Sequence, residues 1–272
     1  PPSPHRKNML PFIINLAREG GELARQLRSS VLQEQSQISC KSTLKDLVTV
    51  ADRQVEEFVS AEIRRRYPSH GIYGEEQGRS NLDSPYCWVI DPIDGTASYI
   101  HNQPFYSTSI GLQYNGRGQA GAVYCPVLRE LFYAERGQGA FCNQQPIRVI
   151  DHGRLADSHV STGFSCLRAG WEECNNLPYF CAVAKEAREI RRFGSAAMDL
   201  CYVAAGKLDA FWELALAPWD VAAGILVIRE AGGIMTRLDG RDAQVGHGPI
   251  VASNGLLHAW LLEQVGERQQ RA

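Results

Sequence analysis

The sequence predicts an α/β (α+β) layered fold of two lobes, with mixed and partly antiparallel sheets. Two observations predict it. Strands follow one another without an intervening helix in the first half, whereas helices and strands alternate in the second half. The 272 residues allow one large domain or two small ones. Because helices and sheets must cover each other's apolar faces, we expect stacked layers, with functional groups collected where the two lobes meet.

Two helices open the chain. Apolar side chains recur at helical spacing over residues 9–31, although two adjacent glycines weaken the pattern in its middle. A second apolar stripe follows Thr49, which is a suitable N-cap residue, and stops before Pro68. We therefore predict two helices before the first long strand.

Extended segments separated by glycine-bearing turns come next and indicate a partly antiparallel sheet. They are Tyr86–Ile90, Ser107–Tyr114, Ala120–Tyr124 and Glu130–Glu135. The second half is predicted to contain strand His159–Phe164, helices Tyr179–Ile190 and Ala196–Ala205, strand Ala210–Leu214, helix Asp220–Ala231, strands Gly232–Leu238 and Ile250–Ala252, and a closing helix Leu256–Val265.

Composition argues against several classes of function. The formal charge is −2 and charged residues make up 21% of the chain, so we expect no nucleic-acid-binding surface. The most apolar stretch, residues 210–228, is interrupted by Glu213, Pro218 and Asp220, which is unsuitable for a membrane span. The first ten residues contain no apolar signal segment. We expect a cytoplasmic protein.

The eight cysteines include no C-x-x-C pair, and a chain of this size does not need disulfide bonds. We interpret them as mostly buried thiols in preference to a disulfide framework, and we do not expect zinc ligation. They are Cys40, Cys87, Cys125, Cys142, Cys166, Cys174, Cys181 and Cys201.

The densest chemistry lies in the segment 88–96, where an apolar strand runs into Asp91 and Asp94, followed by Gly95. Two ionised carboxylates about 4 Å apart repel each other by about 4 kcal/mol at an effective dielectric constant of 20. Such a pair at the end of a buried strand is therefore expected to hold a cation or to share a proton. The glycine would let the backbone come close to a ligand.

Other acids have two interpretations each. Glu75 and Glu76 lie between glycines and could form a solvated turn. Asp52 stands three residues after Thr49, where an acid completes a helix cap, and Asp220 stands near a helix start. Taken singly, capping is the simpler interpretation for both aspartates. A functional role requires these acids to meet in space.

Three segments together resemble the signatures of the inositol monophosphatase family, the Mg²⁺-dependent, lithium-sensitive phosphatases. They are Gly74-Glu75-Glu76, the stretch from Trp88 through Asp91-Pro-Ile-Asp-Gly-Thr96, and Pro218-Trp-Asp-Val-Ala-Ala-Gly224 followed by Glu230-Ala-Gly-Gly233. The resemblance implies a layered sandwich of the inositol monophosphatase/fructose-1,6-bisphosphatase type, active as a homodimer. It also implies a single catalytic domain over residues 5–266, with lobes at about 5–150 and 151–266 and a tail at 267–272.

The resemblance implies two or three Mg²⁺ ions in the site. One ion would be held by Glu75, Asp91 and the carbonyl of Ile93, and a second by Asp91, Asp94 and Asp220. Asp52, Glu75 and Thr96 would orient and activate a water for direct attack on phosphorus. The residues that would contact substrate are Asp94, Gly95, Thr96, Gly194, Ser195, Ala196, Glu213 and Asp220. Carboxylate oxygens suit Mg²⁺, which agrees with these roles.

The substrate is predicted to be a small polyol phosphate, with inositol 1-monophosphate first, because Glu213 can accept hydrogen bonds from a polyol. Histidinol phosphate, fructose 1,6-bisphosphate, 3′-phosphoadenosine 5′-phosphate and NADP are alternatives within the family. The sequence departs from the family pattern at Ala97-Ser98-Tyr99 and at Asn102, and residues 167–178 align poorly. His101 is a candidate general acid, although a structural role is the simpler interpretation.

Two further readings stay open. Asp94-Gly95-Thr96 is similar to part of the nucleophile loop of haloacid-dehalogenase-like phosphatases, but the aspartates here are three positions apart and not two. A non-catalytic metal-binding regulatory scaffold would retain the fold but would not need Asp52 or Thr96.

Overall fold

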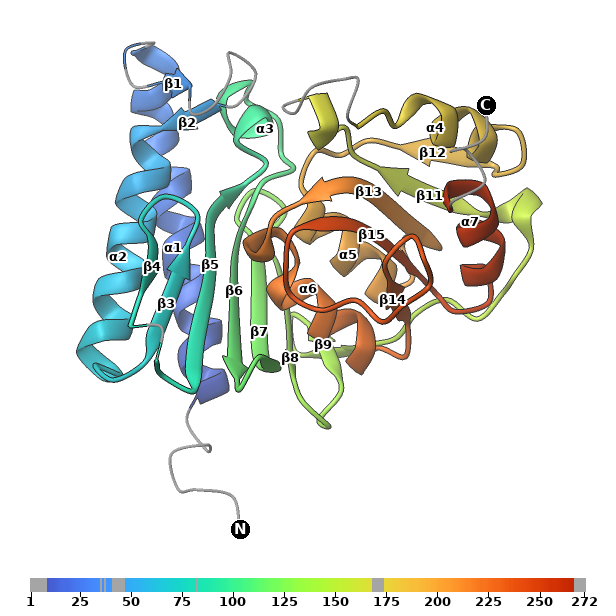
Figure 1. Cartoon of the computed structure of the whole chain (residues 1–272). Helices are drawn as coiled ribbons and strands as arrows, with labels where there is room; N and C mark the ends of the chain where they lie inside the picture. The colour runs from blue at the N-terminus through green and yellow to red at the C-terminus, as the bar shows by residue number, and fades with distance from the viewer. Residues whose placement is uncertain are drawn as a thin grey trace.

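The computed structural model describes residues 9–34, 36, 38–40, 47–81, 83–167 and 174–266. Within these ranges, helices and sheets alternate in five layers, which Figure 1 shows from one side of the molecule to the other. The layers are a pair of N-terminal helices, an eight-stranded sheet, two central helices, a five-stranded sheet and two outer helices. The predicted α/β layered fold is confirmed. The predicted tail, residues 267–272, lies outside the described residues.

The first layer consists of α1 (Met9–Gln33) and α2 (Val50–Arg66). Gly20 and Gly21, which weaken the sequence pattern of α1, are buried. A Cβ atom at Gly21 would lie 2.6 Å from Cδ1 of Tyr124, closer than such atoms can approach. The absence of a side chain therefore allows α1 to pack directly on the sheet.

The eight-stranded sheet has the order β10-β9-β8-β7-β6-β5-β3-β4. Its neighbours are antiparallel except for β3 and β5, which are parallel. The mixed sheet and its four central strands are confirmed, whereas the short strands were missed. The bounds are β3 Gly71–Gly74, β4 Gly78–Ser80, β5 Tyr86–Asp94, β6 Ser107–Tyr114, β7 Arg117–Cys125, β8 Glu130–Glu135, β9 Ala140–Cys142 and β10 Gln145–Ile147.

The central layer consists of α5 (Ala196–Ala204) and α6 (Pro218–Glu230), which pack between the two sheets. Small residues bring α6 unusually close to the eight-stranded sheet. A Cβ atom at Gly111 would lie 2.8 Å from Cβ of Ala222, and one at Gly121 would lie 3.0 Å from Cα of Ala223. The backbone of α6 therefore packs directly against the backbones of β6 and β7 at these two glycines.

The five-stranded sheet has the order β12-β11-β13-β15-β14, and β11 is parallel to both β12 and β13. The remaining pairs are antiparallel. The outer helices α4 and α7 cover its far face. The bounds are β11 His159–Thr162, α4 Leu177–Ala184, β12 Glu189–Arg191, β13 Ala210–Leu216, β14 Ile234–Thr236, β15 Gly248–Ser253 and α7 His258–Val265.

The predicted helix Tyr179–Ile190 was wrong in its second half. α4 ends at Ala184, and Glu189–Arg191 instead form the edge strand β12, paired with β11. Backbone pairing with a sheet edge here outweighs local helix preference.

Shorter elements complete the described chain. β1 (Ile38–Cys40) pairs with β2 (Leu47–Thr49), and single turns of 3₁₀ helix span Leu155–Asp157 and Ser165–Leu167. No helix among the described residues has both the length and the apolar character that a bilayer span requires.

The described cysteine side chains are free thiols, as predicted, but the expectation that most are buried was wrong. Only Cys125, Cys166 and Cys201 are buried among the seven that the structure describes. The others, on β5, on β9, before α4 and within α4, are partly buried or exposed.

Candidate metal centre

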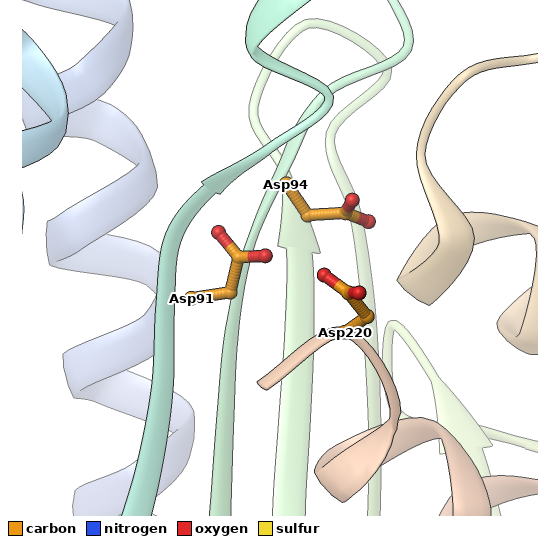
Figure 2. Close-up of side chains that lie close together, drawn as sticks. All are labelled: Asp91, Asp94 and Asp220. Atoms are coloured by element: carbon orange, nitrogen blue, oxygen red, sulfur yellow. The ribbon is translucent and has the colours of Figure 1, made fainter. Parts of the chain in front are cut away.

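Three aspartates from two distant parts of the chain meet between the eight-stranded sheet and α6. Asp91 and Asp94 lie at the end of β5, where a register shift against β6 separates them, and Asp220 lies in the first turn of α6. One carboxylate oxygen from each lies within 4.8 Å of the others. Figure 2 shows the three side chains pointing toward one another. The structure thus brings together the three acids that the family resemblance grouped around one ion.

The electrostatics of this cluster favour a bound cation. Burial raises the pKa of Asp91 well above its ordinary value, and the charges of Glu75, Asp94 and Asp220 raise it further. Burial also raises the pKa of Asp94 to about 6. The Oδ1 atom of Asp91 is buried and has no hydrogen-bond partner among the described residues. Grouped, buried carboxylate oxygens with an unused acceptor fit a hard divalent cation.

Asp220 also has the capping role that was its simpler interpretation. Its Oδ2 atom accepts a hydrogen bond of 2.6 Å from the N–H of Ala217, the residue before α6. The helix start therefore fixes the position of the carboxylate beside Asp91 and Asp94. The capping and functional interpretations are compatible.

Asp52 likewise caps a helix and also contacts a predicted site residue. It forms a capping box with Thr49 at the start of α2: its Oδ2 accepts from the backbone N–H at 2.7 Å and from the hydroxyl at 2.6 Å. Its Oδ1 accepts a hydrogen bond of 3.3 Å from the hydroxyl of Thr96, which also reaches the carbonyl of Ile93 at 3.2 Å. Burial raises the pKa of Asp52 to about 7, against the lowering effect of the bonds from Thr49.

Glu75 reaches the cluster from the turn after β3. Its N–H donates to the carbonyl of Ile90 at 3.2 Å, and its carboxyl group is hydrogen-bonded to Asp91. Two carboxyl groups can share a hydrogen bond only while one of them carries a proton. A cation would replace that proton, which again fits a metal at this position.

Glu56 holds this turn in place, and sequence reasoning missed it. Its buried carboxylate accepts the N–H groups of Glu76 and Gln77 at 2.8 and 2.7 Å. A Cβ atom at Gly74 would lie 2.2 Å from Oε1 of Glu56, so this position needs glycine. The available signal was the spacing of Asp52 and Glu56, which places two acids on one face of α2.

The second lobe contributes directly to the cluster. The hydroxyl of Ser195 donates to Oδ2 of Asp94 at 2.6 Å, and the N–H of Ala197 donates to the same oxygen at 2.7 Å. Gly95 has φ 93°, and a Cβ atom there would lie 3.0 Å from the carbonyl oxygen of Gly194. The end of β5 and the segment before α5 therefore meet closely.

A small cleft of about 60 Å³ opens beside the aspartates. Glu213 lines it and is buried. Its Oε1 accepts the N–H of Ser165 at 2.9 Å. Arg192, which sequence reasoning did not single out, also lines the cleft. The full lining is Asp94, Gly163, Phe164, Ser165, Arg192, Gly194, Ala196, Glu213, Leu216 and Asp220.

His101 and the segment 167–178 are the remaining positions that the sequence analysis considered. His101 is exposed and is the C-cap residue of α3 (Thr96–Ile100), the short helix that Gly95 precedes. Within the segment 167–178, residues 168–173 lie outside the described residues.

Arg28 is another residue that sequence reasoning missed. It comes from α1 and is buried below α3. Its guanidinium donates to the carbonyls of Ser98, Tyr99 and Gln103 at 3.2, 2.9 and 2.6 Å. This contact fixes the segment that follows Gly95 and Thr96. An arginine on the apolar side of a predicted helix was the only signal available.

Comparison with known proteins agrees with this geometry. Residues 5–270 match the model of the inositol monophosphatase family. An inositol-1-monophosphatase of Synechocystis is 42% identical over 235 residues, which is 86% of this chain and 82% of that protein. The Nus factor SuhB of Pseudomonas aeruginosa is 40% identical over 90% of this chain and 91% of its own.

The solved structures agree as well. The crystal structure of the extragenic suppressor protein suhB from Bartonella henselae superposes with a TM-score of 0.86 at 37% identity, covering 94% of this chain and 97% of that one. The likeness in sequence and in three-dimensional structure extends over almost the whole chain. This protein therefore belongs to the inositol monophosphatase family, and is a phosphatase of that family.

Proposed function

We propose that the chain is a Mg²⁺-dependent phosphate monoester hydrolase that acts on a small polyol phosphate, with inositol 1-monophosphate as its substrate. The observation that carries the proposal is the meeting of Asp91, Asp94 and Asp220 within 4.8 Å, beside a cleft that Glu213 lines. Such an acidic centre would repel a phosphate ester unless cations neutralised it.

Two sets of oxygen atoms could hold the ions. Glu75, Asp91 and the carbonyl of Ile93 form one set, and Asp91, Asp94 and Asp220 form the other, so that Asp91 is common to both. Two ions, or three, would activate a water and neutralise the phosphate charge when they are bound. The shared hydrogen bond of Glu75 and Asp91 and the unused Oδ1 of Asp91 support this assignment.

The chain's own residues would orient the attacking water. Because the hydroxyl of Thr96 donates toward Asp52, its oxygen keeps lone pairs that can accept a hydrogen bond from that water. Glu75, whose carboxyl group is hydrogen-bonded to Asp91, would accept the one proton that the water loses as it attacks. The backbone N–H groups of Gly95 and Thr96, at the start of α3, would hold phosphate oxygens. The reaction needs no covalent phosphoenzyme.

The cleft would select the alcohol. Glu213 can accept hydrogen bonds from adjacent hydroxyl groups, and Gly194 and Ala196 line the cleft beside it. Ser195 is fully buried and its hydroxyl is bonded to Asp94, so it would act on the substrate through Asp94. Asp94 and Asp220 would contact the ester through the ions. Arg192 adds a hydrogen-bond donor to the lining, which can pair with a hydroxyl or phosphate oxygen of the ester.

A kinetic comparison of esters tests the substrate. With Mg²⁺, kcat/KM is measured for inositol 1-monophosphate, histidinol phosphate, fructose 1,6-bisphosphate, 3′-phosphoadenosine 5′-phosphate and NADP. We expect the inositol ester to rank first. A preference for any other ester overturns the substrate assignment but not the proposed hydrolysis of a phosphate monoester by water.

Trapping of a covalent intermediate tests the mechanism. An acid-labile aspartyl phosphate trapped during turnover would overturn direct attack by water and favour the haloacid-dehalogenase-like route.

A non-catalytic scaffold is the second candidate, because some relatives are named Nus factors. Against it, the bond between Thr96 and Asp52 has no evident use in a scaffold beyond helix capping. Absence of Mg²⁺-dependent phosphate release over the whole panel would favour the scaffold.

The phosphatase proposal extends to four further properties: a single catalytic unit over residues 5–266, a homodimer, inhibition by lithium and a cytoplasmic location.

A further inference from the structure

A second pocket, of about 290 Å³, lies along one side of α6, from Ala222 to Arg229. The turn between β6 and β7, Arg136 after β8 and the segment 242–245 enclose the rest of it. No residue lines both this pocket and the cleft beside the aspartates, and Asp220 belongs to the lining of the cleft only. The pocket is therefore separate from the candidate metal centre.

Its lining is cationic, in a protein whose overall charge is −2. Arg117, Arg136 and Arg229 line it, and Asp242 is the one acid in the lining. Asp242 pairs with Arg229 at 2.6 Å. Glu230, the neighbouring acid on α6, directs its carboxylate to the N–H groups of Gly137 and Gly139.

The role of Arg229 is explained by the fold, but that of the other two arginines is not. Arg229 also donates to the carbonyl of Ala243 and so fastens the segment 242–245 to α6. Arg136 donates from its Nε to the carbonyl of Gly118 at 2.7 Å, which holds its guanidinium against the wall of the pocket. Neither Arg117 nor Arg136 pairs with a carboxylate among the described residues.

We propose that this pocket binds a small phosphorylated dianion or polyanion. Guanidinium groups recognise phosphate oxygens through paired hydrogen bonds, and the pocket volume is close to the lower limit of about 300 Å³ for small-molecule sites. A ligand there would contact the same helix that presents Asp220 to the metal centre. The inference does not depend on the substrate proposed above.

Inorganic pyrophosphate is the probe, titrated calorimetrically in EDTA. Without divalent ions the clustered aspartates repel an anion, so binding reports on the arginine pocket alone. We expect Arg136→Gln to weaken binding by about tenfold or more, and Arg117→Gln combined with it to abolish binding. Arg64→Gln is the control, because Arg64 is exposed on α2 and the charge change is identical.

The outcomes distinguish binding in the arginine pocket from general charge attraction. Unchanged binding by Arg136→Gln, or an equal loss in Arg64→Gln, would show general charge attraction and overturn the proposal. Melting curves without ligand establish that each variant is folded. If Arg136→Gln is not folded, pyrophosphate binding is measured instead with Arg117→Gln alone, whose position in an exposed turn tolerates the change. Mg²⁺-dependent phosphatase activity without pyrophosphate should be unchanged in all variants.

Discussion

The carboxylate of Glu56 on α2 accepts the backbone N–H of Glu76, 2.8 Å away on the turn between β3 and β4. The turn continues from Glu75, which reaches Asp91 in the candidate metal centre. A residue on the first helix layer thus positions a proposed metal ligand without contacting the metal. Residues outside the acidic cluster therefore help to hold its members in place.

Replacing Glu56 should therefore weaken metal binding. In Glu56→Ala the N–H groups of Glu76 and Gln77 lose a charged acceptor, a loss of about 1.5–3 kcal/mol for each bond. We expect the Mg²⁺ concentration for half-maximal activity to rise by about tenfold. Glu57→Ala, an exposed neighbour on α2, is the matched control. Equal Mg²⁺ dependence in both variants would refute this positioning role.

Asp91→Asn should abolish activity without weakening the metal-free fold. The change removes one of three crowded carboxylates, and with it repulsion that no counter-charge relieves when metal is absent. Differential scanning fluorimetry should show an equal or higher Tm in EDTA and no rise with added Mg²⁺. Asp151→Asn, at an exposed position, should behave as wild type. Near-normal turnover by Asp91→Asn would contradict its bridging role.

Arg28→Met should be strongly destabilising, because it leaves the carbonyls of Ser98, Tyr99 and Gln103 without their donor. Losing a buried charged donor to three acceptors predicts a decrease of about 3 kcal/mol in the free energy of unfolding, measured by urea denaturation. Lysine should not restore it, since an ammonium lacks the planar fork. Arg25→Met is the exposed control on α1, and an equal effect there would exclude a specific role.

Asp199 should make the folded state less stable as pH rises. Burial raises the pKa of this carboxyl group well above its ordinary value, Glu213 and Asp94 raise it further, and Arg192 lowers it. Above about pH 4 the unfolded chain releases this proton while the folded protein retains it, so stability falls with increasing pH. Asp199→Asn should flatten the slope of unfolding free energy between pH 5 and 8. Parallel slopes for variant and wild type would contradict the assignment.

The sequence was sufficient for the layers, since the helical and extended segments carry strong local patterns, and the family resemblance was sufficient to group Asp91, Asp94 and Asp220. It was insufficient for Glu56, because an acid in the run Val55-Glu56-Glu57 has the same appearance as a solvated helix position. Its burial depends on where the turn after β3 comes to lie. The second half of the predicted helix 179–190 failed for a similar reason: a distant strand, β11, decides the conformation of residues 189–191.

Gly111 and Gly121 take no part in the chemistry, yet they determine how near the backbone of α6 comes to the sheet. Asp91 and Asp94 belong to the sheet and Asp220 belongs to that helix, so the span across the acidic centre depends on this approach. A single added methyl group at position 111 would lift the helix and widen the centre. If the acids hold a divalent ion, a wider centre would suit a larger ion better than Mg²⁺, so the packing of two glycines outside the site would influence ion preference.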